Sequence, residues 1–277
     1  MTQFDLHSHS NISDGFLSPE DLLMRAAAQG VEALALTDHD TLAGLDRARV
    51  AAAACGVELI NGIELSCLWG KIGVHIVGLN VDPDSACLQA GVASQLAVRE
   101  ERAIKIAERL RKQGIPGVLD GARAIAGEAV IGRPHFARYL VESGAVATLS
   151  QAFKKYLGTG KAGDVKNMWP NFIDAIEWIH AAGGVAVLAH PAKYGLTRTK
   201  LGALVGSFAE SGGDALEIIS GRQDRAVTDS LVRLAQQRQL HASCGSDFHL
   251  PDQPWQELGA FGTMPADCSP VWELWQA

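Results

Sequence analysis

The chain has 277 residues, of which 47% are hydrophobic and 20% charged, a composition that excludes a disordered, collagen-like or coiled-coil protein. It carries 31 acidic and 24 basic residues, so its net charge of −7 lacks the overall positive footprint of a protein that binds long duplex nucleic acid. Aromatic residues make up only 6%, which disfavours a stacking platform for single strands.

The cysteines and the N-terminal segment indicate where such a protein would work. None of the five cysteines belongs to a C-x-x-C pair, so we expect reduced thiols and no disulfide framework. The N-terminal segment lacks the basic and apolar regions of a secretory signal, and no apolar run is long enough to span a membrane. We therefore expect a soluble cytoplasmic protein with no membrane partner.

The first third of the chain alternates strand-like and helix-like segments. Ser18 and Pro19 favour the start of the first helix, because serine caps helices well and proline is tolerated in the first turn. In chain order the sequence predicts a strand near 4–8, a helix over 18–30, a strand near 32–37, a helix over 42–55, and strands near 57–65 and 74–80. This alternation predicts a parallel sheet with helical crossovers.

The middle of the chain breaks this rhythm, because residues 85–158 show only helical signals. We expect helices over 90–113, 119–126, 134–142 and 149–157, separated by glycines. A run of helices inside an alternating chain predicts an inserted helical subdomain over 86–169, with 1–85 and 170–277 forming the main domain.

The alternation then resumes to the end of the chain. The sequence predicts a helix over 171–182, a strand near 185–190, a helix over 201–211, a strand near 215–220, a helix over 224–239 and a strand near 241–246. Seven parallel strands with outer helices fit a barrel or a large open sheet.

Polar clusters follow most of the predicted strands, and His75 lies inside the fourth. They are His7-x-His9 with Asp14, Asp38-His39-Asp40, Glu64, His190-Pro191 and Asp247-x-His249. The carboxyl ends of parallel strands meet at one rim, which is where ligands bind in such folds. Each motif alone is common, but six of the nine histidines occupy these positions. His180 and His241 lie off the rim, and we expect them to be structural.

Imidazole and carboxylate donors together suit zinc, manganese or iron more than calcium or magnesium alone. The donors exceed what one ion needs, so we expect two or three ions with acids bridging them. Clustered ions activate a water molecule and neutralise phosphate oxygens, so hydrolysis is the expected chemistry.

Basic residues that could hold an anionic substrate occur at three places. Arg99, Arg102 and Lys105 share roughly one helix face, although this could instead be a solvated face with ion pairs to neighbouring glutamates. Arg133 and His135 bracket a predicted helix start, where anions bind well. Arg222 follows the sixth strand.

Taken together, these residues carry a resemblance to a known family. The motifs His7-x-His9, Asp14-Gly15, Thr37-Asp38-His39-Asp40, Gly62-x-Glu64, His75, His190-Pro191 and Ser246-Asp247-x-His249 resemble those of the polymerase and histidinol phosphatase (PHP) family of metal-dependent phosphoesterases. The resemblance covers the chain except residues 85–170. It implies an α/β fold, a distorted (β/α)7 barrel with a helical insertion that forms part of the substrate pocket.

The resemblance also implies three ligand sets for divalent ions, with manganese expected and iron or zinc as alternatives. They are His7, His9, Glu64 and Asp247 for the first ion, Asp14, His39 and His249 for the second, and Glu64, His75 and His190 for the third. Asp14, His39, Glu64, Asp247 and His249 are then the catalytic residues. Asp38 could orient a ligand imidazole. On the sixth strand Glu217 matches an acid of the family, whereas Ser220 stands near an expected asparagine.

The implied function is a phosphomonoesterase that removes a phosphate, the 3′-phosphate, from a nucleoside 3′,5′-bisphosphate by attack of a metal-bridging hydroxide. Its partner is a small phosphorylated nucleotide, whose second phosphate is held by residues from the basic set: Arg99, Arg102, Lys105, Arg133, His135 and Arg222. Three alternatives remain open: a 5′→3′ exonuclease on short RNA or DNA ends, a histidinol phosphate phosphatase, and a non-catalytic structural module.

Overall fold

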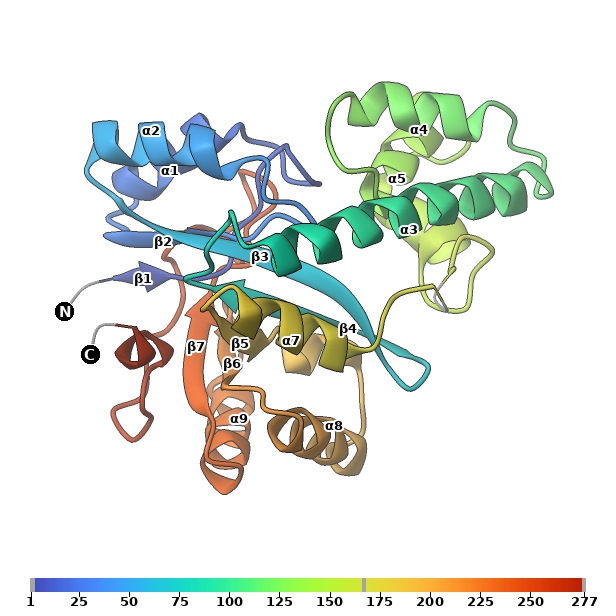
Figure 1. The fold of residues 1–277 in the computed structure, drawn as a ribbon. Helices are drawn as coiled ribbons and strands as arrows, with labels where there is room; N and C mark the ends of the chain where they lie inside the picture. The colour runs from blue at the N-terminus through green and yellow to red at the C-terminus, as the bar shows by residue number, and fades with distance from the viewer. Residues whose placement is uncertain (1–2, 166–167, 276–277) are drawn as a thin grey trace.

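A seven-stranded sheet curls into a nearly closed barrel in the computed structural model, which describes residues 3–165 and 168–275 (Figure 1). The strands are paired in sequence order: β1 (Phe4–Asp5), β2 (Ala33–Leu36), β3 (Glu58–Trp69), β4 (Ile72–Leu79), β5 (Val185–Leu188), β6 (Ala215–Ser220) and β7 (His241–Gly245). The first and last strands approach each other, since the Leu6 N–H donates to the Cys244 carbonyl at 3.0 Å. All seven predicted strands are confirmed, and so is the PHP-type α/β fold.

The expectation of a wholly parallel sheet is wrong at β4, which is antiparallel to both β3 and β5. Only Gly70 and Lys71 separate β3 from β4, and Gly70 has a φ of 60°. Two residues can close an antiparallel hairpin, but a parallel crossover needs a dozen or more. The remaining neighbouring pairs in the sheet are parallel.

Helices cover the outside of the barrel, and an apolar cluster of small and large side chains fills its inside. The outer helices are α1 (Pro19–Ala28), α2 (Leu45–Cys55), α7 (Phe172–Ala181), α8 (Arg198–Glu210) and α9 (Arg225–Gln237). Along β2, Leu34 and Leu36 pack outward with α1 and α2, whereas Ala33 and Ala35 join the interior cluster. Both faces of the strand are thus buried, which explains its continuous apolar sequence. No helix in the described ranges is long and apolar enough to cross a membrane.

Between β4 and α7 the chain forms a run of helices, called the insertion below, which projects to one side of the barrel (Figure 1). Its elements are α3 (Ala86–Arg111), α4 (Val118–Ala126), α5 (Arg133–Glu142), α6 (Leu149–Ala152) and a π-helical turn (Phe153–Leu157). They bury an apolar cluster of their own, with Leu110, Phe136 and Leu140 among its fully buried members. We propose on this basis that residues 86–169 are a subdomain.

A buried ion pair joins α3 to the barrel. The Arg99 Nε donates to Asp40 Oδ2 at 2.6 Å, and both side chains are almost fully buried. Asp40 Oδ1 also accepts from the Ser66 N–H at 2.7 Å and from Gln95 at 3.0 Å. Because Asp40 lies in the loop after β2 and its carboxylate accepts from both α3 and β3, it ties the insertion to the rim of the barrel.

Replacing Asp40 with asparagine is expected to lower the free energy of unfolding by about 3 kcal/mol, because Arg99 would keep a buried charge with no counter-charge. Urea unfolding of the chelated protein, followed by circular dichroism, measures this. The matched control is Asp46→Asn, which breaks the exposed Asp46–Arg49 pair and should cost about 1 kcal/mol or less. Equal losses in the two variants would contradict this role of Asp40.

Candidate metal centre

The structure gathers all nine side chains that the sequence nominated as metal ligands at one rim of the barrel. His7 and His9 follow β1, His39 follows β2, and His190 follows β5. Glu64 and His75 lie within the antiparallel pair β3 and β4, and the loops after β1 and β7 supply the remaining three, which are Asp14, Asp247 and His249. Most are buried and the rest are half-buried. The turn that reverses β4 thus lets a mid-strand histidine reach a site built from strand ends.

Glu64 lies at the centre of this group and is fully buried. Its Oε1 is 2.8 Å from His75 Nδ1 and 2.9 Å from His190 Nε2. Its Oε2 lies 3.0 Å from His39 Nδ1, 3.2 Å from His9 Nε2 and 3.3 Å from His7 Nε2. Five imidazoles therefore surround one carboxylate, whose two oxygens face different sets of rings.

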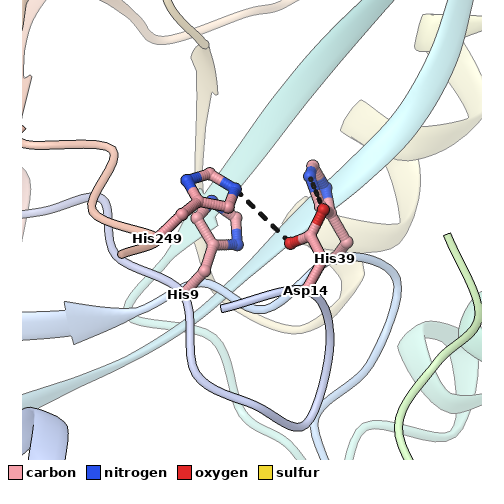
Figure 2. A group of neighbouring side chains, drawn as sticks. All are labelled: His9, Asp14, His39 and His249. Atoms are coloured by element: carbon pink, nitrogen blue, oxygen red, sulfur yellow. Dashed lines mark ion pairs between the residues drawn. The ribbon is translucent and has the colours of Figure 1, made fainter. Parts of the chain in front are cut away.

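Two aspartates flank this arrangement. Asp14 lies between two rings, with Oδ1 3.4 Å from His249 Nε2 and Oδ2 3.8 Å from His39 Nε2 (Figure 2). Asp247 Oδ1 is 3.4 Å from His9 Nε2 and 3.5 Å from His249 Nδ1. Each aspartate thus shares a histidine with the other, and the cluster is continuous.

The donor set fits more than one metal ion. Four groups bring ligand atoms within 4.8 Å of one another: His9, Asp14, His39 and His249; His7, Glu64 and His190; His7, His9 and Asp247; and His39, Glu64 and His75. His7 Nε2, His9 Nε2 and Glu64 Oε2 are buried and lack a hydrogen-bond partner within the described ranges, as expected of atoms that face a cation. The groups overlap the implied ligand sets but divide His75 and His190 between two of them.

The electrostatics of the cluster favour bound positive charge. Burial would raise the pKa of Glu64, but His39, His75 and His7 hold that pKa well below its usual range. Burial opposes a charge on His9, yet Asp247 and Glu64 raise its pKa to about 10. Burial lowers the pKa of His39 to about 4. Neighbouring histidines also hold the pKa values of Asp14 and Asp247 well below their usual range, so all three carboxylates offer negative charge to a cation.

A layer of hydrogen bonds orients the imidazoles. Glu217 accepts or shares a proton with His7 Nδ1 at 3.0 Å, and its other oxygen accepts from the His190 N–H. Glu217, which matches an acid of the family on the sixth strand, thus contacts the ring of His7 and the backbone of His190. Ser220 adds no such support, because its buried Oγ has no hydrogen-bond partner within the described ranges.

Asp38 does not orient a ligand imidazole as expected. Its Oδ1 accepts from the Ser10 N–H at 2.8 Å and from Ser13 Oγ at 2.7 Å, and its Oδ2 accepts from Ser10 Oγ at 2.6 Å. The carboxylate therefore shapes the loop that carries Asp14. The hydrogen-bond partners of Asp38 could not be predicted from the sequence, because they depend on how this loop folds back over β2.

Lys193 is a site residue that the sequence analysis missed. Its Nζ lies 2.5 Å from Asp247 Oδ2, and its side chain is 40% exposed. The one available signal is its position three residues after His190, in a short 3-10 turn that follows β5.

Three arginines and a histidine of the insertion form a basic group beside the metal-ligand cluster: Arg99, Arg102, Arg133 and His135. Arg102 is buried, its Nε donates to the Val165 carbonyl at 2.7 Å, and it has no carboxylate hydrogen-bond partner within the described ranges. The guanidinium groups of Arg99 and Arg102 lie 5.3 Å and 5.2 Å from the centre of the Trp169 ring. Burial, with the like charges of Arg133 and Arg99, lowers the pKa of Arg102 to about 9. An anion bound here would relieve that repulsion.

Other nominated substrate residues are placed differently. The Arg99 Nε donates to Asp40. His135 Nδ1 accepts from the Gly132 N–H at 3.0 Å, so the proton of the neutral ring is on Nε2. The solvated-face alternative describes Lys105, which is exposed and pairs with Glu101 at 2.6 Å, but neither buried arginine. Arg222 is exposed at the end of β6.

Off the rim, His180 pairs with Asp214 at 2.7 Å, and His241 begins β7.

Known proteins resemble this chain over nearly its whole length. Residues 5–112 match the family described as PHP domain. The chain is 47% identical to a 5′-3′ exoribonuclease from Haemophilus influenzae, with 98% of each chain covered. It is 42% identical to a 3′,5′-nucleoside bisphosphate phosphatase from Chromobacterium violaceum, over 100% of this chain and 98% of the relative.

Solved structures agree with the sequence relatives. A Chromobacterium violaceum protein described as an amidohydrolase with bound sulfate and no metal superposes with a TM-score of 0.91 and 43% identity, over 99% of this chain and 96% of that one. A Bifidobacterium adolescentis protein described as a metal-dependent phosphoesterase gives a TM-score of 0.81 and 27% identity, over 98% and 93% of the two chains.

Glu217→Gln is expected to weaken metal binding about 10- to 100-fold, because the amide would orient His7 less well and raise its basicity less. Calorimetric titration of the chelated protein with Mn²⁺ measures this. Glu210→Gln, an exposed glutamate of α8 that lies 3.8 Å from Arg238, is the matched control. Unchanged affinity in Glu217→Gln would show that this carboxylate does not support the site.

Proposed function

Because the chain belongs to the PHP family of metal-dependent phosphoesterases, hydrolases of phosphoester bonds, we propose that it removes the 3′-phosphate from a nucleoside 3′,5′-bisphosphate. One observation carries the proposal: a cluster of nine buried or half-buried histidine and carboxylate donors lies beside the buried Arg102, whose hydrogen-bond partners within the described ranges include no carboxylate. The cluster of donors suits the phosphate that is hydrolysed, and the arginine suits the phosphate that stays on the nucleoside.

We assign the nine donors as ligands of two or three divalent ions, with manganese proposed and iron or zinc as alternatives. The assigned ligands are His7, His9, Asp14, His39, Glu64, His75, His190, Asp247 and His249. Ions held there would supply Lewis-acid chemistry, activating water and neutralising phosphate oxygens. Among them, Asp14, His39, Glu64, Asp247 and His249 surround the position proposed for the reacting phosphorus.

In this proposal Arg102 and Arg133 bind the second phosphate of the substrate. Arg102 is buried and Arg133 is half-buried, and burial lowers the pKa of both. The charges of Asp164 and Asp14 act on the pKa of Arg133 in the opposite direction, so this arginine interacts with the Asp14 carboxylate of the metal-ligand cluster. In the reaction, the oxygen of water bonds to phosphorus and the P–O3′ bond breaks. The 3′ oxygen takes up a proton, and inorganic phosphate leaves. Holding the 5′-phosphate away from the cluster presents the 3′-phosphate to it.

A 5′→3′ exonuclease is the second candidate, and the same geometry favours it. Relatives from Haemophilus influenzae and Escherichia coli, 47% and 45% identical, are named 5′-3′ exoribonucleases. If the arginines hold a 5′-phosphate, the P–O3′ bond of the first nucleotide lies at the metal-ligand cluster in both substrates. A nucleoside 3′,5′-bisphosphate is then the shortest version of a 5′-phosphorylated strand.

The other two alternatives are less well supported. Histidinol phosphate has one phosphate group, so it would leave the basic group around Arg102 without an anion. A non-catalytic structural module has no need for a complete donor set. In this chain each of the nine positions proposed to bind metal carries a histidine, an aspartate or a glutamate.

Chelation followed by dialysis is expected to abolish phosphate release from adenosine 3′,5′-bisphosphate, and added Mn²⁺ should restore it, because the proposed chemistry depends on bound cations. A colorimetric phosphate assay measures this, with circular dichroism as the check that the fold persists. Full activity after chelation would contradict the metal assignment.

The double variant Arg102→Met, Arg133→Met is expected to raise the KM for the bisphosphate about tenfold or more, because two charged hydrogen-bond donors are lost. Its KM for adenosine 3′-monophosphate, which lacks the 5′-phosphate, should change little. Arg111→Met, at an exposed position of α3, controls for loss of charge on the helix. An unchanged bisphosphate KM would move the second phosphate elsewhere.

A further inference from the structure

Two exposed aromatic side chains lie at the rim of the barrel. The chain has 8 Phe, 6 Trp and 3 Tyr, all at described positions. Phe16 is 58% exposed and Trp255 is 56% exposed, whereas every other aromatic side chain is buried or half-buried. The low aromatic content argued against a stacking platform, but that argument concerns number and not position.

Both aromatics belong to the loops that carry proposed metal ligands. Phe16 comes two residues after Asp14, and its backbone N–H donates to the His249 carbonyl at 2.8 Å. Next to Trp255, the Gln256 side chain donates to the Asp247 carbonyl at 2.8 Å. The two rings therefore begin within a residue or two of the backbone that holds the candidate metal centre.

The aromatics and the basic group lie on different sides of Asp14. The insertion contacts the loop after β1 two residues before Asp14, where the Val130 N–H donates to the Ile12 carbonyl at 2.9 Å. Phe16 comes two residues after Asp14 in the same loop, beside His249. In Figure 2 the chain of the insertion (green) and the chain that leads to His249 (orange) lie on opposite sides of Asp14.

We propose that Phe16 and Trp255 stack the bases of a single-stranded polynucleotide on the 3′ side of the bond that is cut. This rests on the proposed function, in which Arg102 and Arg133 hold the 5′-phosphate. A strand fixed at that end and cleaved at the P–O3′ bond must continue past the metal-ligand cluster, toward the two aromatics. Every base offers a stacking face, so this contact needs no particular sequence.

Charge at this place is compatible with a strand. The Arg222 backbone N–H donates to the Trp255 carbonyl at 2.7 Å, and its exposed side chain uses Nε on the Ala260 carbonyl at 3.3 Å. Its terminal nitrogens are left for a backbone phosphate. For such a substrate, water adds to phosphorus and the P–O3′ bond breaks. The first nucleotide leaves with a 3′-hydroxyl, and the shortened strand keeps the phosphate at its new 5′ end.

The test compares two substrates in the manganese-loaded protein: adenosine 3′,5′-bisphosphate and a 5′-phosphorylated oligoadenylate of about ten nucleotides, a length that exceeds one stacking site. The variant is Phe16→Ala, Trp255→Ala, and the matched control is Met24→Ala, 55% exposed on α1. We expect kcat/KM for the oligonucleotide to fall about fivefold to a hundredfold in the double variant, from the loss of base stacking. The value for the bisphosphate should stay unchanged.

Equal values for wild type and double variant on the oligonucleotide would overturn the inference, and so would equal losses on both substrates. A wild type that cuts only the bisphosphate overturns it while leaving the proposed function standing. A wild type that cuts only the oligonucleotide, with the expected loss in the variant, supports the inference and contradicts the bisphosphate assignment. If neither is cut, fluorescence anisotropy with the labelled oligonucleotide decides: equal affinities for the two proteins overturn the inference.

Discussion

A carboxylate with no access to water stands at the centre of this molecule. Glu64 is ionised inside the barrel rim, and an ionised group in such a place requires nearby positive charge. The chain meets this requirement by bringing five histidines from four different strands or strand ends to one point. The barrel is the scaffold that makes this convergence possible, since the strand ends of a curled sheet face a common centre. The proposed activity follows from the same requirement, because cations that satisfy Glu64 are also the cations that hydrolyse phosphoesters.

The insertion poses the opposite electrostatic problem. Two buried arginines, Arg99 and Arg102, gather there with the half-buried Arg133. Asp40 pairs with Arg99, and Asp164 contributes negative charge near the other two. Trp169 offers the electron-rich face of its ring to two of the guanidiniums, which eases their proximity without neutralising them. The donors that would hold cations in the barrel therefore lie beside the positive charge of the insertion. A substrate with two phosphates, one bound through those cations and one bound by the arginines, complements both parts.

Much of this could be predicted from the sequence, and the failures have physical causes. Glycine stops and helix caps located the helices, and histidines at strand ends located the site. The direction of β4 is not encoded in its side-chain pattern, although the two-residue Gly70–Lys71 connection was a usable signal. The helix-face argument placed Arg99, Arg102 and Lys105 together, but depth along α3 is decided by tertiary packing, which buries the first two and exposes the third. Contacts such as Lys193 with Asp247 depend on loop paths that no local pattern shows.

The reversed strand has a consequence for where the insertion stands. Because β4 runs away from the rim, α3 starts at the far end of the barrel, where Ser85 Oγ bonds the carbonyl of Ala181 at the end of α7. At 26 residues, α3 is about 39 Å long, whereas the four residues of β5 span only about 13 Å. A helix that starts at the end of the barrel opposite the rim, and is three times as long as β5, must extend beyond the rim. The hairpin thus determines that α3 carries the insertion past the rim that holds the metal-ligand cluster, whereas a parallel fourth strand would have carried it past the opposite end of the barrel.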